Sequence, residues 1–295
     1  MKILKKIFSI EKDVTHKIIQ FCGIKFRLLK FNRQTSLISE CCAREIYSAL
    51  EVSKLHSQVF PKFKNCNANK NVTIVGCGPT IQYYDNEINS LNLALNKSIL
   101  RDNIEFDYIF ATDSYLLKTC PGYLDIIKNK KGIKFIGKYL NPEFGLNFPI
   151  IKDEEKYNIY RYYTASRRGL PSLKQFEYEI HDDITTYPLP GYYSISFAAL
   201  KFILWTYPDK IYLVGLDTAH VGNFFDGASS YNYKKMIEGY KRFKAFAEKY
   251  YPETEIISVN PVGLKGIFKE VYTQRYVDEH PELLNENIEI IGKEV

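Results

Sequence analysis

The chain has 295 residues, of which 45% are hydrophobic and 25% are charged, so it can bury the core of one long α/β domain or of two smaller units. No apolar run approaches the length of a membrane-spanning helix and no cleavable signal sequence follows Met1, so we expect a cytoplasmic protein. The net charge of +6 is unevenly placed. Residues 1–35 hold nine Lys or Arg against two acidic residues, and the remaining residues hold 31 against 32.

The basic N-terminal arm, residues 1–36, interleaves its cations with large apolar side chains. This pattern suits an anionic membrane surface better than a nucleic-acid groove, so a peripheral position on the inner face of the membrane is one interpretation. The other is a pair of β-strands over residues 18–31, IIQFCGIKFRLLKF, docked on the domain with a charged outer face. Neither interpretation predicts binding to nucleic acid.

After the arm, apolar residues at helical spacing predict a helix over residues 36–59 that Pro61 ends. The Lys- and Asn-rich residues 61–70 are expected to be a linker, so that residues 37–69 form a helix and linker and the main domain spans 70–295. The six cysteines form no C-x-x-C pair and have no histidines at zinc spacing, which is typical of reduced intracellular thiols.

From residue 70 onward, short apolar strands alternate with helical segments. This alternation predicts an α/β fold with a mostly parallel, Rossmann-like sheet and helices on both faces. We expect strands at 72–75, 91–95, 108–111, 133–136, 211–214 and 256–259, and helices at 196–205 and 233–250. Ligands of such sheets bind at the carboxyl ends of the strands.

The strongest binding signal is the stretch NVTIVGCGPT, where a β-branched run stops in a glycine-rich turn. Glycine has no Cβ, so such a turn lets bare backbone approach a ligand. A dinucleotide fingerprint would have Gly or Ala at the position of Ile81, and no Gly-Lys-Ser/Thr follows for a P-loop. A nucleotide or nucleotide-sugar site is therefore favoured over classical NAD binding. The turn residues that we assign to this site are Gly76, Cys77, Gly78, Pro79 and Thr80.

Polar residues also follow the later strands, and five strand ends together favour a site even though each residue alone is more often a turn residue. The residues assigned on this ground are Asn96, Asp113, Ser114, Asp217 and Asn260. A second feature is the start of the helix at 196–205, where free N–H groups and the helix dipole suit an anion. It adds Gly191, Tyr192 and Ser194 to the predicted site.

An insertion over residues 139–190 has little periodicity and is rich in Tyr and Arg. Its arginines, Arg161, Arg167 and Arg168, are of the kind that makes bidentate contacts with phosphate or carboxylate, so we favour a lid over an anionic ligand. The alternative is an ordinary solvated excursion, although long loops inside compact domains are uncommon without a role.

Several motifs, taken in order, resemble a known family: V-G-C-G-P-T, L-A-L-N, F-A-T-D, P-G-Y-Y-S, I-Y-L-V-G-L-D and V-N-P. They are similar to those of the bacterial sialyltransferases of glycosyltransferase family 42 and of the wider group with motility-associated and pterin pyrophosphokinase-like proteins. The resemblance covers residues 71–268. It implies a GT-A-type sheet that lacks the metal-binding D-x-D motif, and this chain has no D-x-D.

The resemblance also implies roles for the predicted residues. The glycine-rich turn would lie against the phosphate and ribose of the donor, and Asn96 and Asp113 would hold donor hydroxyls. Gly191 and the hydroxyl groups after it would contact the sugar carboxylate or the cytidine. Cys77 and Asp113 stand where the sialyltransferases have Asn, and the family's catalytic His has no counterpart between residues 225 and 249.

We therefore expect a metal-independent, inverting transfer of a sialic acid-like sugar from a CMP-activated donor to a cell-surface glycan, with no cofactor besides the nucleotide sugar. His220, three residues after a strand end, is the candidate base because its ordinary pKa suits proton transfer near neutral pH. Tyr231 is the candidate that stabilises the departing phosphate. One alternative is a Mg-dependent pyrophosphokinase with Asp113 and Asp217 as metal ligands. The other is a degenerate, non-catalytic partner in envelope polysaccharide synthesis.

Overall fold

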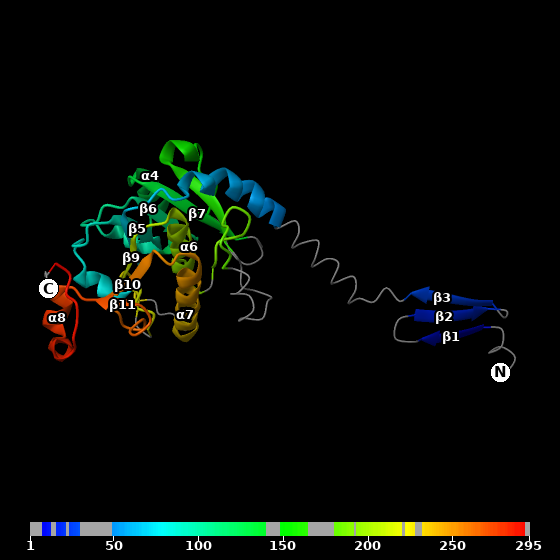
Figure 1. The fold of residues 1–295 in the computed structure, drawn as a ribbon. Coiled ribbons are helices and arrows are strands. Elements are labelled where there is room, and N and C mark those ends of the chain that lie inside the picture. The colour runs from blue at the N-terminus through cyan, green and yellow to red at the C-terminus, as the bar shows by residue number, and fades with distance from the viewer. Residues whose placement is uncertain are drawn as a thin grey trace. The chain divides into compact units, whose positions relative to one another are not determined.

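The structure is a computed structural model. It describes residues 8–12, 16–21, 24–29, 49–139, 148–164, 180–191, 193–219, 222–227 and 232–292. The chain divides into two compact units, Met1–Leu50 and Glu51–Val295 (Figure 1). Among the described helices, none is long and apolar enough to cross a membrane.

The N-terminal unit contains a three-stranded antiparallel sheet in the order β1-β2-β3. The pair of strands expected within residues 18–31 is present as β2 and β3, which are separated by two residues, the length of the tightest hairpins. A further strand, β1, precedes them. Binding of this unit to an anionic membrane stays a prediction. The strands are β1 (Phe8–Lys12), β2 (His16–Phe21) and β3 (Ile24–Leu29).

The large unit is built on an eight-stranded sheet in which every neighbouring pair is parallel, which confirms the predicted α/β, Rossmann-like fold. Its order is β11-β10-β9-β4-β5-β6-β7-β8, so the chain runs outward from β4 to one edge and then returns to β9 on the other side of β4. The switch in direction lies between β4 and β9, which is where ligands of such sheets bind. The strands are β4 (Asn71–Val75), β5 (Leu91–Leu95), β6 (Tyr108–Ala111), β7 (Ile133–Tyr139), β8 (Ile159–Thr164), β9 (Lys210–Val214), β10 (Glu255–Val259) and β11 (Lys269–Val271).

Both faces of the sheet are covered, because successive side chains of a strand point to opposite sides. Ile74 and Leu93 belong to one buried cluster, and their neighbours Val75 and Ala94 belong to another. The first cluster includes side chains of α6 and α7, and the second includes side chains of α3 and α4. The described α-helices include α3 (Leu116–Thr119), α4 (Tyr123–Asn129), α6 (Ser196–Thr206), α7 (Tyr233–Tyr250) and α8 (Gln274–Glu279), and residues 49–59 are also helical. The 3-10 helices are η1 (Phe60–Phe63), η2 (Pro79–Tyr83), η3 (Asn96–Leu100), η5 (Glu154–Tyr157) and η6 (Pro281–Asn285).

Residues 61–70, expected as a linker, are packed within the large unit. Phe63 is part of the first buried cluster. Asn67 is buried, its Nδ2 donates to Thr206 Oγ1 at 2.9 Å, and its Oδ1 accepts from the Tyr108 hydroxyl at 3.0 Å. This segment is held because its amide groups find buried partners that a Lys- and Asn-rich composition does not reveal. The predicted boundaries at residues 36 and 69 stay predictions.

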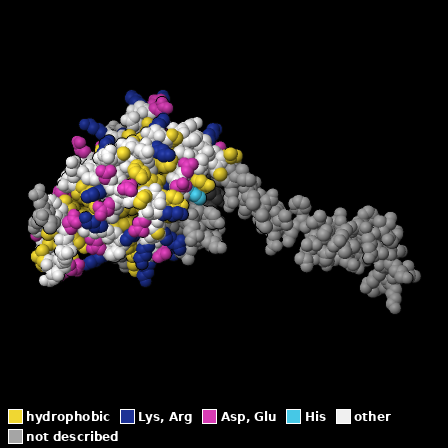
Figure 2. All heavy atoms as spheres, viewed as in Figure 1, with side chains coloured by type: hydrophobic (Ala, Val, Ile, Leu, Met, Phe, Trp, Pro, Cys, Tyr) yellow, Lys and Arg dark blue, Asp and Glu magenta, His cyan; other side chains and the backbone are white. Residues whose placement is uncertain are grey.

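The insertion over 139–190 contributes a strand of the sheet, β8, which pairs in parallel with β7 at the sheet edge. Arg161, expected to face an anionic ligand, donates from Nε to Glu154 Oε1 at 2.9 Å and from Nη2 to the Pro149 carbonyl at 2.7 Å. It therefore serves the packing of this edge. Arg167 and Arg168 lie outside the described residues. Among the described side chains visible in Figure 2, acidic and basic groups are interspersed, in keeping with the near-neutral composition after residue 35.

Candidate functional site

A cavity of about 330 Å³ lies at the carboxyl ends of β4, β5, β6 and β9. Its walls come from the turns after these four strands, from the residues that precede α6, from the loop 222–227 and from the first turn of α7. The predicted site residues that line it are Gly76, Cys77, Gly78, Asn96, Asp113, Ser194 and Asp217. Motifs that are up to about 140 residues apart in the sequence thus meet at one place.

The glycines after β4 have a packing role that the sequence analysis did not predict, and their predicted contact with a ligand stays a prediction. Gly76 N donates to the Val214 carbonyl at 2.8 Å, and Gly78 N donates to the Gly215 carbonyl at 2.7 Å. A Cβ at Gly76 would lie 2.4 Å from the Gly215 oxygen, and a Cβ at Gly78 would lie 2.5 Å from Asp217 Oδ2. We expected a ligand to require these glycines. The structure shows that the close approach of the β4 and β9 ends already requires them.

Asp217 is buried and is held by Thr80. Thr80 N donates to Oδ2 at 2.9 Å, and the Thr80 hydroxyl donates to Oδ1. Burial raises the pKa of the Asp217 carboxyl, and the two hydrogen bonds from Thr80 act in the opposite direction. Thr80 is itself buried, so its hydroxyl binds this carboxylate inside the protein.

The end of β5 presents a different arrangement. Asn96 has a φ of +49°, a left-handed conformation that Asn tolerates better than most residues, and the Tyr123 hydroxyl donates to its carbonyl at 2.9 Å. The Cys77 thiol donates to the Leu95 carbonyl at 3.2 Å. Burial raises the pKa of this thiol to about 12, which disfavours the thiolate, the nucleophilic form of cysteine.

Lys97, which sequence reasoning missed, extends into this cavity. Its Nζ lies 2.5 Å from Asp226 Oδ2, and its side chain is only 7% exposed, against 35% for Asp226. A lysine next to a strand end is usually solvated, so nothing in the sequence separated it from the chain's other lysines. The nearest signal was its position directly after Asn96, which was predicted.

The loop 222–227 carries Asp226 to Lys97. Phe224 N donates to the Cys77 carbonyl at 2.8 Å, which fastens the loop to the glycine-rich turn. The Arg101 guanidinium lies 5.8 Å from the centre of the Phe224 ring, a cation–π distance. Gly227 N donates back to the Asn223 carbonyl at 2.8 Å, so the loop also closes on itself.

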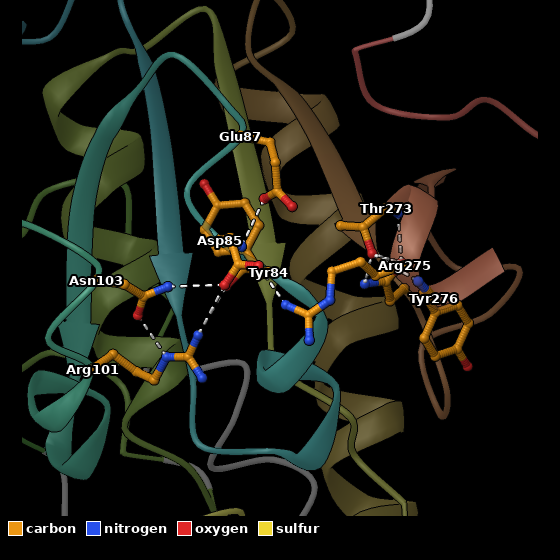
Figure 3. Close-up of polar contacts among 9 residues, drawn as sticks. Tyr84, Asp85, Glu87, Arg101, Asn103, Thr273, Arg275 and Tyr276 are labelled. Atoms are coloured by element: carbon orange, nitrogen blue, oxygen red, sulfur yellow. Dashed lines mark hydrogen bonds and ion pairs between the residues drawn. The ribbon is translucent and has the colours of Figure 1, made fainter. Parts of the chain in front are cut away.

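Arg101 is in turn held by a polar network that joins the segments after β4 and β5 to α8 (Figure 3). Its Nη2 donates to the Tyr84 carbonyl at 3.1 Å and lies 3.5 Å from Asp85 Oδ1. Asn103 Nδ2 donates to the same Asp85 oxygen at 3.0 Å, and Arg275 of α8 pairs with the other one. The helix α8 is therefore connected through Asp85 to Arg101, which contacts Phe224 of the loop 222–227.

The remaining predicted residues have other positions. Asp113 is exposed at the rim, where its Oδ1 accepts from Tyr115 N at 2.9 Å. The Ser194 hydroxyl oxygen accepts from the Ser196 hydroxyl at 2.7 Å. Asn260 is buried and bonds to Thr273, which caps α8. The predicted residues absent from the described cavity lining are Pro79, Thr80, Ser114, Gly191 and Asn260. Those outside the described residues are Tyr192, His220 and Tyr231.

Within the described part of the chain, no three His, Cys, Asp or Glu side chains are grouped so as to hold a metal ion. The prediction that the reaction needs no metal is not tested by this and stays a prediction.

No protein-family model and no curated protein matches the chain. Among solved structures, the chain is similar to the sialyltransferase CstII from Campylobacter jejuni, determined in complex with the substrate analogue CMP-3FNeuAc. The two chains are 14% identical, the match covers 75% of this chain and 86% of that one, and the TM-score is 0.40. At this TM-score the likeness supports no statement about the site or the function of this chain.

Proposed function

We propose that the chain is a glycosyltransferase that binds a nucleotide-activated sugar in the cavity at the carboxyl ends of β4, β5, β6 and β9. The observation that supports this proposal is the meeting of the separate sequence motifs in one cavity at the switch point of the sheet. Its volume, about 330 Å³, falls within the range of roughly 300 to 1,000 Å³ that is common for small-molecule sites.

The lining residues have the chemistry that such a ligand needs. Lys97 provides a cation for phosphate, and Asn96 and Asp113 provide polar groups for sugar or ribose hydroxyls. Tyr115, which is 61% exposed and lines the cavity, offers an aromatic face for a base or sugar ring. The donor that we propose is a CMP-linked, sialic acid-like sugar, and the acceptor is a hydroxyl of a cell-surface glycan.

Inverting transfer needs a base that takes the acceptor proton and groups that stabilise charge on the departing phosphate. In our proposal His220 acts as the base and Tyr231 stabilises the leaving group. Both belong to the segment after β9, which also provides Asp217 to the cavity wall. Loss of transfer in His220→Ala with unchanged binding of CMP would support this role, and full activity would remove His220 from the mechanism.

The pyrophosphokinase alternative requires Asp113 and Asp217 as magnesium ligands. Both oxygens of Asp217 already accept hydrogen bonds from Thr80, so a cation would have to share a buried carboxylate with these donors. This observation favours metal-independent transfer over the magnesium-dependent alternative.

A thermal-shift screen tests the proposal, with CMP, CDP, UDP, GDP and ATP each offered with Mg²⁺ and with EDTA. A ligand present at about 100 times its Kd stabilises the folded state by about 2.7 kcal/mol, which is easily detected. Stabilisation by CMP or CDP that persists in EDTA is expected, and it would lead to assays of CMP-sugars as donors. Stabilisation by ATP with Mg²⁺ alone would favour the pyrophosphokinase, and silence throughout would favour the non-catalytic partner.

A further inference from the structure

The charge of the cavity is unusual for a site that is proposed to bind a phosphate. Lys97 is the single Lys or Arg side chain of the described lining, which also contains the three carboxylates of Asp113, Asp217 and Asp226. A phosphate that entered this cavity would be repelled by three acidic groups and attracted by one cation. That cation is engaged, because Asp226 Oδ2 lies 2.5 Å from its Nζ.

The two partners of this ion pair differ in burial. The Lys97 side chain is 7% exposed, so its ammonium group needs an anionic partner at all times. The Asp226 side chain is 35% exposed, and its carboxylate can be hydrated when it leaves the lysine. When the ion pair breaks, we therefore expect Lys97 to stay buried and the Asp226 carboxylate to move into solvent, provided that another anion binds the lysine.

The loop that carries Asp226 has supports other than this ion pair. Phe224 N is bonded to the Cys77 carbonyl at 2.8 Å, and the Phe224 ring lies against Arg101. The Asn223 side chain accepts from Phe225 N at 2.9 Å. We therefore expect the loop to stay folded when the carboxylate is displaced from Lys97. Loss of the ion pair should then have little effect on the stability of the fold.

We propose that Asp226 occupies the place of the ligand's phosphate on Lys97 in the free protein, and that a phosphate-bearing ligand binds by exchanging with it. Lys97 is then the residue that makes the site select a nucleotide over its nucleoside. Asp226 lowers the affinity for the phosphate, because the ligand must displace its carboxylate from Lys97. The inference rests on the proposed function, because it assigns the phosphate-binding group of that same cavity.

Isothermal titration calorimetry with CMP and cytidine tests the exchange in four proteins: wild type, Lys97→Met, Asp226→Asn and the double variant. Wild type is expected to bind CMP more tightly than cytidine. Lys97→Met should weaken CMP binding about tenfold or more and leave cytidine unchanged, because a charge-assisted contact to the phosphate is lost. Asp226→Asn should tighten CMP binding by about fivefold, again without an effect on cytidine.

The double variant distinguishes two explanations of a gain in affinity: removal of the competitor for Lys97, and removal of a negative charge from the cavity. If Asp226 acts by occupying Lys97, then Asn at position 226 gains nothing once Lys97 is Met. An equal gain in both backgrounds would mean simple removal of a negative charge and would overturn the inference. Equal affinity of wild type for CMP and cytidine would also overturn it. Lys97→Arg, which keeps the charge, should keep the preference for CMP, and thermal unfolding of each variant checks that it is folded.

Failure of this inference differs from failure of the proposed function. If CMP binds but neither variant changes its preference over cytidine, the cavity still binds a nucleotide and only the exchange is wrong. UMP, GMP and AMP with their nucleosides complete the set, since the base is not identified. If wild type and Asp226→Asn bind none of these nucleotides, both the proposed function and the exchange are wrong.

Discussion

The carboxyl ends of β4 and β9 are closed onto each other, whereas those of β5 and β6 direct polar groups to the cavity. At the first pair, backbone N–H groups of Gly76 and Gly78 bond across to β9, and the Asp217 carboxylate is satisfied by Thr80. At the second pair, Lys97 and Asp113 line the cavity, the lysine paired with Asp226 and the aspartate exposed.

The difference shows that one sequence signature can have two physical causes. A strand followed by glycine or a polar residue marks an end where the chain must turn, and at β4 and β9 the turn is used to bring two strands together. At β5 and β6 the same kind of residue lines the cavity. We call the ends of β4 and β9 the closed pair and the ends of β5 and β6 the open pair. We therefore expect substitutions in the closed pair to alter the free energy of unfolding, and substitutions in the open pair to alter the affinity for the ligand.

The largest effect on stability is expected for Gly78→Ala. The new Cβ would lie 2.5 Å from Asp217 Oδ2 and 2.8 Å from the Gly215 carbonyl oxygen, so the two strand ends must separate. We expect a loss of about 3 kcal/mol in the free energy of unfolding, measured by urea denaturation.

Gly266→Ala is the matched control for this substitution. Gly266 has a φ of +77° and nothing within 4 Å of a Cβ placed there, so its substitution adds a left-handed backbone penalty of about 1 kcal/mol and no clash. Gly78 has a φ of −72°, so its substitution adds the clash and no such penalty. If Gly78→Ala costs no more than Gly266→Ala, the β4 and β9 ends are not in the close contact described above.

A second test of the closed pair is Thr80→Val, which keeps the shape and removes the hydroxyl that donates to Asp217. Because the buried carboxylate loses a hydrogen-bond donor, this substitution should lower the free energy of unfolding by about 2 kcal/mol. Thr186→Val removes a hydroxyl that donates to Asp183 Oδ2 at 3.1 Å on the surface, and it should cost less than about 0.5 kcal/mol. Equal costs for the two would show that the Asp217 contact is as weak as a solvated one.

Much of the sheet could be predicted from the sequence. The six strands expected from apolar runs are all present, because short β-branched and aromatic runs between turn residues carry a strong signal. β8 was missed because IYRYYT, a strand at the sheet edge, alternates aromatic and polar residues without an apolar run. β11 was missed because it has only three residues, KEV.

The site was harder to predict, because its chemistry depends on which strand ends become neighbours. Nothing in NVTIVGCGPT shows that Gly215 and Asp217 will pack against its glycines, since β9 lies far away in the sequence and pairs with β4 only through the fold. Lys97 was missed for a related reason. Its burial results from the loop that carries Asp226, about 130 residues later.

The open pair is tested by Asp113→Ala. Asp113 is exposed, so the free energy of unfolding should change by about 0.5 kcal/mol or less. If its carboxylate binds hydroxyls of the ligand, the affinity for cytidine should fall by about tenfold, measured by calorimetry. Asp102→Ala, which removes an exposed carboxylate that lies 3.4 Å from Lys130 Nζ, should leave the affinity unchanged. Equal affinities for the two variants would contradict a binding role for the β6 end.

The smallest effect is a pH dependence that arises from Asp217. Burial raises the pKa of its carboxyl above the ordinary value of 3.8, so the folded state binds this proton more tightly than the unfolded state does. Between the two pKa values the folded state carries more protons, and the stability contributed by Asp217 therefore falls as the pH rises from about 3.8 upward. Asp217→Asn has no such proton, so the advantage of wild type over this variant should shrink across the same range in urea denaturation at a series of pH values. A difference that instead grows with pH would mean that the hydrogen bonds from Thr80 outweigh burial, and the closed pair would then be a site that stabilises negative charge.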